Sequence, residues 1–139
     1  MTPMTDSPQP VYRGFNPPHL TFPGMSQAVR CGGLVVVSGQ VALGHDGRVV
    51  SGDPGAQAEQ CFANLDAALR LAGVSSTDVV KLVCYLTDAS YFGAYSAARK
   101  RRFGDLAPAG TTVVVAGLLD PMMLMEVEAW AVVRQPSDG

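Results

Sequence analysis

Residues 124–133 near the end of the chain alternate strictly between two sets of side chains. One set is Met125, Val127, Ala129, Ala131 and Val133, and the other is Leu124, Glu126, Glu128, Trp130 and Val132. Successive side chains of a β-strand point to opposite faces of the sheet, so this period of two predicts a strand. A second β-branched apolar run, residues 111–116, precedes it and also predicts a strand.

The two glutamates of the last strand are the first candidates for chemistry. Glu126 and Glu128 share a predicted face with Leu124 and Trp130. A carboxylate on such a face is costly unless it is paired, hydrogen-bonded or bound to a ligand. Glu126 is therefore the leading functional candidate, and a salt bridge across a subunit interface is the alternative. For Glu128 a structural role is favoured over a catalytic one, in a pair with a basic residue of its own or of the next chain.

Length and charge limit the possible classes of protein. The 139 residues predict a single domain over residues 19–135, after a flexible Pro-rich lead (1–18) and before a disordered tail (136–139). Apolar runs are too short for a transmembrane helix, and the N-terminus lacks the pattern of a secretory signal, so we expect a cytoplasmic protein. The net charge of −2 argues against nucleic acid and anionic membranes as partners.

The remaining pattern predicts a layered α+β domain. Strands are expected at 26–30, 33–41, 79–87 and, shorter, at 48–50; helices are expected over about 18 residues after Asp53 and over 91–103. Residues 34–37 are apolar at both parities, which is typical of a strand buried on both faces. Two helices on the same side cover only one face of a sheet, so we expect a symmetric oligomer to cover the other.

The cysteines and histidines do not form a recognisable catalytic or metal-binding motif. Cys31, Cys61 and Cys84 sit within apolar patterns, which favours buried thiols in a reducing compartment. A nucleophilic cysteine paired with His19 or His45, or a His/Cys metal site, is the less favoured alternative.

Residues 99–102 (Arg-Lys-Arg-Arg) form one basic cluster. At about 100° per residue, four consecutive side chains spread around a helix and do not form one continuous face. A solvated helix end, with cations near the carboxyl end of the helix dipole, is favoured over an RNA-binding surface.

Three stretches together resemble the RidA/YjgF family of small trimeric proteins. They are VVVSGQVAL (35–43), residues 56–88, and the closing PAGTT and MEVEAWAVV segments, so the resemblance covers residues 22–133. It implies a chorismate-mutase-like α+β fold, with a mixed sheet, two helices on one face, and a homotrimer around a central β-barrel. It also implies small-molecule clefts between subunits. Archetypal members hydrolyse reactive enamines and imines to 2-keto acids and ammonia, as 2-iminobutanoate/2-iminopropanoate deaminases do, without metal or organic cofactor.

The resemblance implies a set of site residues. Glu126 corresponds to the glutamate that positions or activates water, and the arginine that grips the substrate carboxylate is replaced by Gly110. The remaining positions in the implied site are Met25 (a tyrosine in archetypal members), Ser38, Gly39, Ser96 (an asparagine in archetypal members), Thr111 and Thr112.

Without an arginine at position 110, the sequence suggests an arginine-lacking branch of the family with an atypical substrate. A wider, more apolar cleft would suit a larger or uncharged ligand, unless Arg13, Arg30 or Arg102 enters it. The leading hypothesis is hydrolytic deamination of an enamine or imine, or a related hydrolysis. A non-catalytic ligand-binding or chaperone-like trimer is the alternative, and RNA binding is a distant third.

Overall fold

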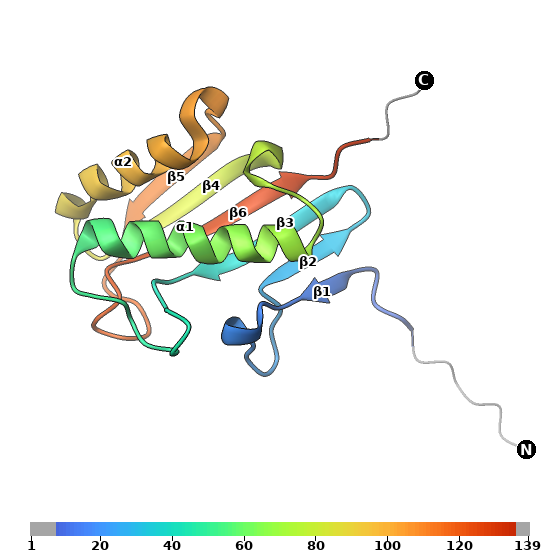
Figure 1. Cartoon of the computed structure of the whole chain (residues 1–139), viewed down its shortest axis with the longest axis horizontal. Helices are drawn as coiled ribbons and strands as arrows, with labels where there is room; N and C mark the ends of the chain where they lie inside the picture. Colours follow the sequence, from blue (N-terminus) through green and yellow to red (C-terminus); the bar gives the residue numbers. More distant parts are fainter. Residues whose placement is uncertain (1–7, 136–139) are drawn as a thin grey trace, which may run out of the picture.

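The computed structural model describes residues 8–135, which form one six-stranded sheet with two α-helices on one face (Figure 1). The expected tail, 136–139, and the first seven residues of the expected lead lie outside the described residues. The bounds are β1 (Arg13–Phe15), β2 (Ala28–Cys31), β3 (Leu34–Gln40), α1 (Pro54–Leu71), β4 (Val79–Leu86), α2 (Phe92–Phe103), β5 (Ala109–Val114) and β6 (Met125–Val132).

The strands lie in the order β1-β2-β3-β6-β4-β5. All neighbours are antiparallel except β4 and β5, which run parallel. β5 and β6 follow one another in the chain, yet β4 lies between them. The last strand of the sequence is therefore central in the sheet, and β5 is left as an exposed edge.

Two expectations about short segments need correction. The expected flexible lead contains β1, which pairs with β2 through Gly14 and Val29, so ordered structure begins before residue 19. The expected strand at 48–50 is reduced to a single bridge between Leu43 and Val49. The residues between Leu43 and Val49 form a turn, in which Gly47 takes a positive φ of 76°.

The first helix forms where the sequence predicts it. The Asp53 side chain caps it by accepting a hydrogen bond from the Ala56 amide at 2.8 Å, and Pro54 occupies its first turn. Gly73, with φ of 84°, follows its end. Neither described α-helix combines the length and apolar character needed to span a bilayer. The expected cytoplasmic location stays a prediction.

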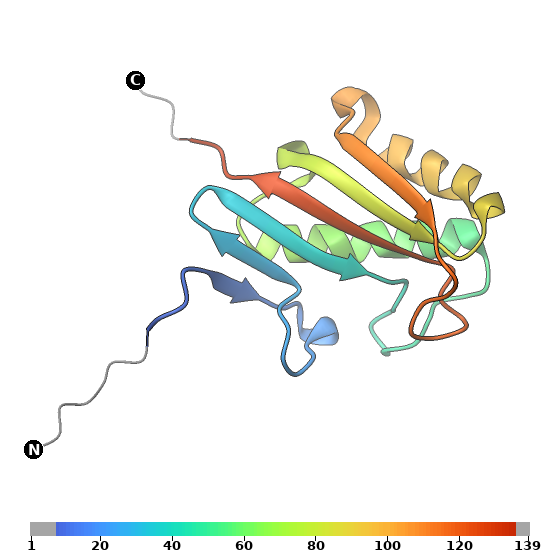
Figure 2. The same ribbon diagram turned by 180° about the vertical axis from the view of Figure 1, so that it is seen from behind.

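β6 separates the core from the open face of the sheet. Its side chains toward the helices, Met125, Val127, Ala129 and Ala131, are fully buried. Its alternate side chains are only partly covered, with Trp130 44% exposed. The predicted alternation is therefore confirmed. Figure 2 shows the face that no described helix covers, and there Leu34 of β3 is 40% exposed beside Val132.

The cysteine prediction is correct for two residues of three. Cys61 and Cys84 are buried, and burial raises the pKa of the Cys84 thiol to about 12. Cys31 is exposed, so the prediction of burial there is wrong. It is the last residue of β2, at the turn into β3.

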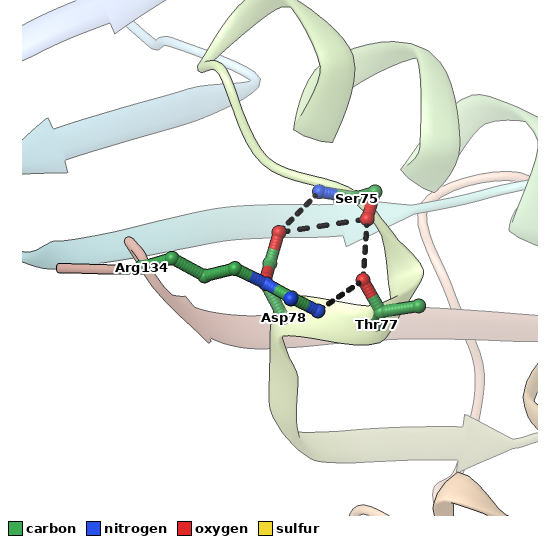
Figure 3. A network of polar contacts seen from close by, with 4 residues as sticks. All are labelled: Ser75, Thr77, Asp78 and Arg134. Carbon is green, nitrogen blue, oxygen red and sulfur yellow. Dashed lines mark hydrogen bonds and ion pairs between the residues drawn. The ribbon is translucent and has the colours of Figure 1, made fainter. Parts of the chain in front are cut away.

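A polar network joins the turn after α1 to the end of β6 (Figure 3). Ser75 and Asp78 form a capping box, in which the Ser75 amide donates to Asp78 Oδ2 at 2.9 Å. Arg134 donates from Nε to Asp78 Oδ1 at 2.8 Å and from Nη2 to Thr77 Oγ1 at 3.1 Å. These bonds tie the start of β4 to the carboxyl end of its neighbour β6.

We predict that Arg134→Gln destabilises the protein by less than about 1 kcal/mol near neutral pH, because the pair is at the surface. Arg134 is the main cause that lowers the pKa of Asp78 below its usual value of 3.8. A lowered pKa stabilises the fold above the unfolded pKa, and this contribution is lost as pH falls through the folded pKa. Urea unfolding at about pH 7 and about pH 3 should show the parent–variant difference shrinking in acid.

The matched control is Arg48→Gln, which removes the same charge from an exposed loop where no ion pair is present among residues 8–135. An Arg134→Gln effect of equal size at both pH values would contradict the role assigned to the ion pair with Asp78.

Candidate functional site

Glu126 lies on the open face of β6, with its carboxylate against the backbone of Gly39 in β3. A Cβ atom at position 39 would come within 2.7 Å of Glu126 Cδ and 2.9 Å of its Cγ. The β3–β6 register shifts between Val37 and Gln40, which marks a β-bulge around Ser38 and Gly39. Because residue 39 is a glycine, the Glu126 carboxylate can occupy the space that a side chain at position 39 would fill.

A cavity of about 310 Å³ brings together three residues of the predicted site: Met25, Gly39 and Glu126. Its other walls are mainly apolar. They come from the segment before β2, from the end of β3, and from the β5–β6 connection: Leu20, Phe22, Val41, Leu43, Leu119 and Met123. Glu126 is thus a partly buried carboxylate at the side of an apolar pocket.

The two glutamates of β6 have different surroundings. The Tyr85 hydroxyl of β4 donates a hydrogen bond to Glu128. No basic residue within residues 8–135 forms an ion pair with Glu128, and a pair with a basic residue of a neighbouring chain stays a prediction. Among residues 8–135, no hydrogen bond or ion pair holds the Glu126 carboxylate. Burial, and secondarily the charge of Glu128, raise the pKa of Glu126 above its usual range. Glu126 is the carboxylate left available for a ligand.

A pair of buried glutamines adds a hydrogen-bond donor to this cavity. Gln40 Nε2 donates to Gln27 Oε1 at 2.7 Å and to the Ser38 carbonyl at 2.9 Å. Gln27 is only 2% exposed, it lines the cavity, and its Nε2 has no partner in the described part of the chain. A buried donor without a partner points to a bound water or ligand. Sequence reasoning missed both glutamines, although polar residues flanking apolar strands were a visible signal.

Ser38 has a structural role in this arrangement. Its hydroxyl donates to the Ser26 carbonyl at 2.6 Å, which joins the bulge to the segment before β2. The side chain therefore supports the cavity that Gly39 and Glu126 line, and only its neighbour Gly39 faces into that cavity.

The other predicted residues lie elsewhere, around the edge strand β5. Gly110 pairs with Leu82 of β4, which is buried under the helices, so Gly110 faces α2. Gly110 and Thr112 line a cavity of about 580 Å³ between α2 and β5, and Ser96 lines a neighbouring one of about 360 Å³. Thr111 pairs with Val83 and faces the opposite side.

The candidate site is therefore divided between two faces of the sheet. Glu126 lies on the open face, whereas Gly110 lies on the helix face and is separated from β6 by β4. A single chain does not bring the two groups together.

Sequence reasoning also missed the arginine nearest to Gly110. Arg99 of α2 lines both cavities around β5. The three arginines considered from the sequence are engaged elsewhere. Arg102 pairs with Asp66, Arg30 Nη1 donates to the Ala72 carbonyl at 3.3 Å, and Arg13 lies 5.0 Å from the centre of the Phe15 ring.

The histidines contact each other. The ring centres of His19 and His45 are 4.2 Å apart, and His19 Nε2 lies 3.3 Å from Asn64 Oδ1. No hydrogen bond joins a cysteine to a histidine within residues 8–135, so a Cys/His nucleophilic pair finds no support there. In the same residues, no three His, Cys, Asp or Glu side chains gather closely enough to hold a metal ion.

Comparison with known proteins identifies the family. The family model described as Endoribonuclease L-PSP matches residues 21–133, most of the chain. A RutC family protein of Pyrococcus abyssi is 36% identical over 107 residues, 76% of this chain and 84% of the relative. The chain belongs to the RidA/YjgF family.

Two further RidA/YjgF relatives bear on function. A 2-iminobutanoate/2-iminopropanoate deaminase of Dermatophagoides farinae is 34% identical over 94 residues, 67% of this chain and 73% of the relative. Escherichia coli TdcF, whose structure contains bound serine, has 28% sequence identity to this chain. The two structures superpose with a TM-score of 0.76, and the match covers 82% of this chain and 91% of the TdcF chain. Family members thus include a deaminase and a protein that binds a small amino acid.

We predict that Glu128→Gln lowers the pKa of Glu126 toward the ordinary value of 4.5. The substitution removes the like charge that, after burial, raises this pKa, so Glu126 should lose its proton at lower pH. NMR titration of the Glu126 side-chain carboxyl measures the shift directly. Glu59→Gln removes an equal charge at the distant Arg101 pair and should leave the titration unchanged. A Glu126 pKa that is identical in the parent and in Glu128→Gln would show that burial alone sets it.

Proposed function

We propose that this protein hydrolyses a reactive enamine or imine to a 2-oxo product and ammonia, with Glu126 as the residue that activates water. The observation that carries the proposal is an unpaired, partly buried carboxylate with a raised pKa at the wall of an apolar cavity. The deaminase among the relatives supports the same reaction class. A carboxylate whose pKa is raised toward the operating pH is suited to both accept and return a proton.

The proposed reaction balances without a cofactor. An enamine first gains a proton from solvent at carbon, and an imine gains one at nitrogen, so both give an iminium ion. The water oxygen then adds to the iminium carbon while Glu126 accepts a proton from the water, which gives a neutral carbinolamine. Glu126 returns this proton to nitrogen, the carbon–nitrogen bond breaks, and ammonia leaves as the carbinol hydroxyl gives its proton to solvent and becomes the carbonyl. The free Nε2 of Gln27 is placed to donate a hydrogen bond to oxygen in the same cavity.

We further propose that the complete site lies between subunits of a homotrimer. Glu126 and Gly110 face opposite sides of the sheet, so a neighbouring subunit would be needed to join the cavity of Glu126 to the groove between α2 and β5. The open face of the sheet has the apolar character of an interface, with Leu34, Trp130 and Val132 each at least 40% exposed. β5 is an edge strand that a neighbour could cover.

RNA binding finds less support. Within the basic cluster at 99–102, Arg101 pairs with Glu59 and Arg102 with Asp66. These pairs reduce the positive charge available to phosphates, on which nucleic-acid affinity mostly depends. A ligand-binding trimer without turnover, the alternative that the sequence left open, would keep the same cavity and is distinguished by the assay below.

We predict that Glu126→Gln lowers the rate of imine hydrolysis by roughly 10² or more, because the amide cannot accept a proton from water. Imines generated in place from amino acids by an amino-acid oxidase provide the substrate, and release of the 2-oxo acid is measured. Glu59→Gln serves as the charge-matched control and should retain the parent rate. A parent that binds ligand but shows no turnover would favour the non-catalytic alternative.

We predict that Gly39→Ala lowers activity nearly as much as Glu126→Gln while the protein stays folded. The added methyl group would occupy the space of the Glu126 side chain, which must then rotate away. Gly33→Ala, just before the same strand, is the matched control, because the added methyl group would come no closer than 4.0 Å to its neighbour, Gln135 Nε2. Full activity of Gly39→Ala, with an unchanged Glu126 titration, would refute the positioning role of this glycine.

A further inference from the structure

Arg99 is an unpaired cation inside a groove. Its Nη1 lies 3.5 Å from the position that a Cβ atom at Gly110 would take, and its guanidinium lies 5.4 Å from the centre of the Tyr95 ring. The side chain is partly buried. Two other arginines of α2, Arg101 and Arg102, have carboxylate partners, whereas Arg99 has none within residues 8–135.

Within residues 8–135, the two cavities that Arg99 lines contain no acidic side chain. The larger cavity it lines, about 580 Å³, contains the Thr112 hydroxyl as its polar neighbour and is otherwise bounded by residues such as Leu86, Phe92 and Val114. The adjoining cavity contains another cation, Lys100, and no acidic residue. The Arg99 charge also acts on the protein interior, where it opposes the effect of burial on the pKa of Cys84. A partly desolvated cation in such a place favours binding of an anion.

Gly110 leaves the space beside the Arg99 guanidinium free of a strand side chain. The φ angle of Gly110 is not in the positive range, so its backbone conformation does not require glycine. The consequence of glycine here is the missing side chain: a longer residue on β5 would extend into the space that the guanidinium borders. Helix α2 therefore places the Arg99 guanidinium beside Gly110, a position where β5 has no side chain.

We propose that Arg99, lying over Gly110, binds the carboxylate of a small 2-imino or 2-oxo acid whose aliphatic side chain packs along Leu86, Phe92 and Val114. A guanidinium can hold a carboxylate with two parallel hydrogen bonds, and the apolar wall suits a hydrocarbon body. The inference rests on the proposed function for the reaction, but the anion site stands on its own geometry. It differs from the sequence-based expectation of a larger or uncharged ligand.

The first experiment measures binding and not turnover. The full-length protein is titrated with 4-methyl-2-oxopentanoate and with the neutral ketone 4-methylpentan-2-one, while NMR follows the Arg99 Nε–H signal. Arg99→Gln should weaken binding of the carboxylate by about 10- to 100-fold and leave the neutral ketone unaffected. Arg101→Gln, which removes the same charge from the same helix, should bind the carboxylate as the parent does.

A double variant tests the position of the charge. Arg99→Gln combined with Gly110→Arg moves the guanidinium from the helix to the strand and should restore carboxylate binding. Loss of binding through misfolding of Arg99→Gln would also abolish binding of the neutral ketone, so the two probes separate the causes. Carboxylate affinity that is equal in the parent and Arg99→Gln, or equal affinity of the parent for inorganic phosphate, would overturn the inference.

The turnover assay separates this inference from the proposed function. If the parent hydrolyses the imine and Arg99→Gln does so with the same KM, the role of Arg99 is refuted and the proposed reaction is not. Carboxylate binding that depends on Arg99, without turnover in the parent, would keep the anion site and refute the hydrolysis. A KM for the leucine-derived imine that rises at least tenfold in Arg99→Gln, with little change in kcat, is the expected result.

Discussion

The rest of the structure depends on how β6 is buried: one of its faces is covered by the helices and the other is open. This strand lies between β3 and β4, and its four inward side chains are completely buried under the helices. Because side chains alternate across a strand, the same burial that forms the core forces Glu126 and Glu128 onto the opposite face. A shift of one residue in register would bury both carboxylates in the core, so the packing of β6 also fixes the position of the candidate catalytic group.

On the open face, small differences in surroundings give the two glutamates different roles. Glu128 accepts a hydrogen bond from Tyr85, which is across the ladder on β4. Glu126 lies against Gly39 at a bulge, in an apolar cavity that raises its pKa. A desolvated carboxyl group holds its proton more tightly. The identical residue type thus serves as support at one position and as candidate base two residues earlier.

The division of the site between two faces gives a physical reason for assembly. One face offers a carboxylate in an apolar cavity, and the other offers the Arg99 guanidinium in a groove beside the edge strand. Neither alone provides both a group that activates water and a group that holds an anionic substrate. The exposed apolar side chains around Trp130 would also be covered in an assembly, so interface formation and completion of the site can be stabilised together.

The sequence by itself determined both helices and every strand except β1, and it indicated the family. The alternation of residues 124–133, the Asp53 cap with Pro54, and the SGQ segment were sufficient, because strand periodicity and helix capping are local properties of the chain. Tertiary structure alone decided which side chains meet. The insertion of β4 between β5 and β6 placed Gly110 and Glu126 on opposite sides, and the packing of α2 on β5 brought Arg99 to Gly110. Such contacts depend on strand order and helix placement, which the periodicity of a single segment does not encode.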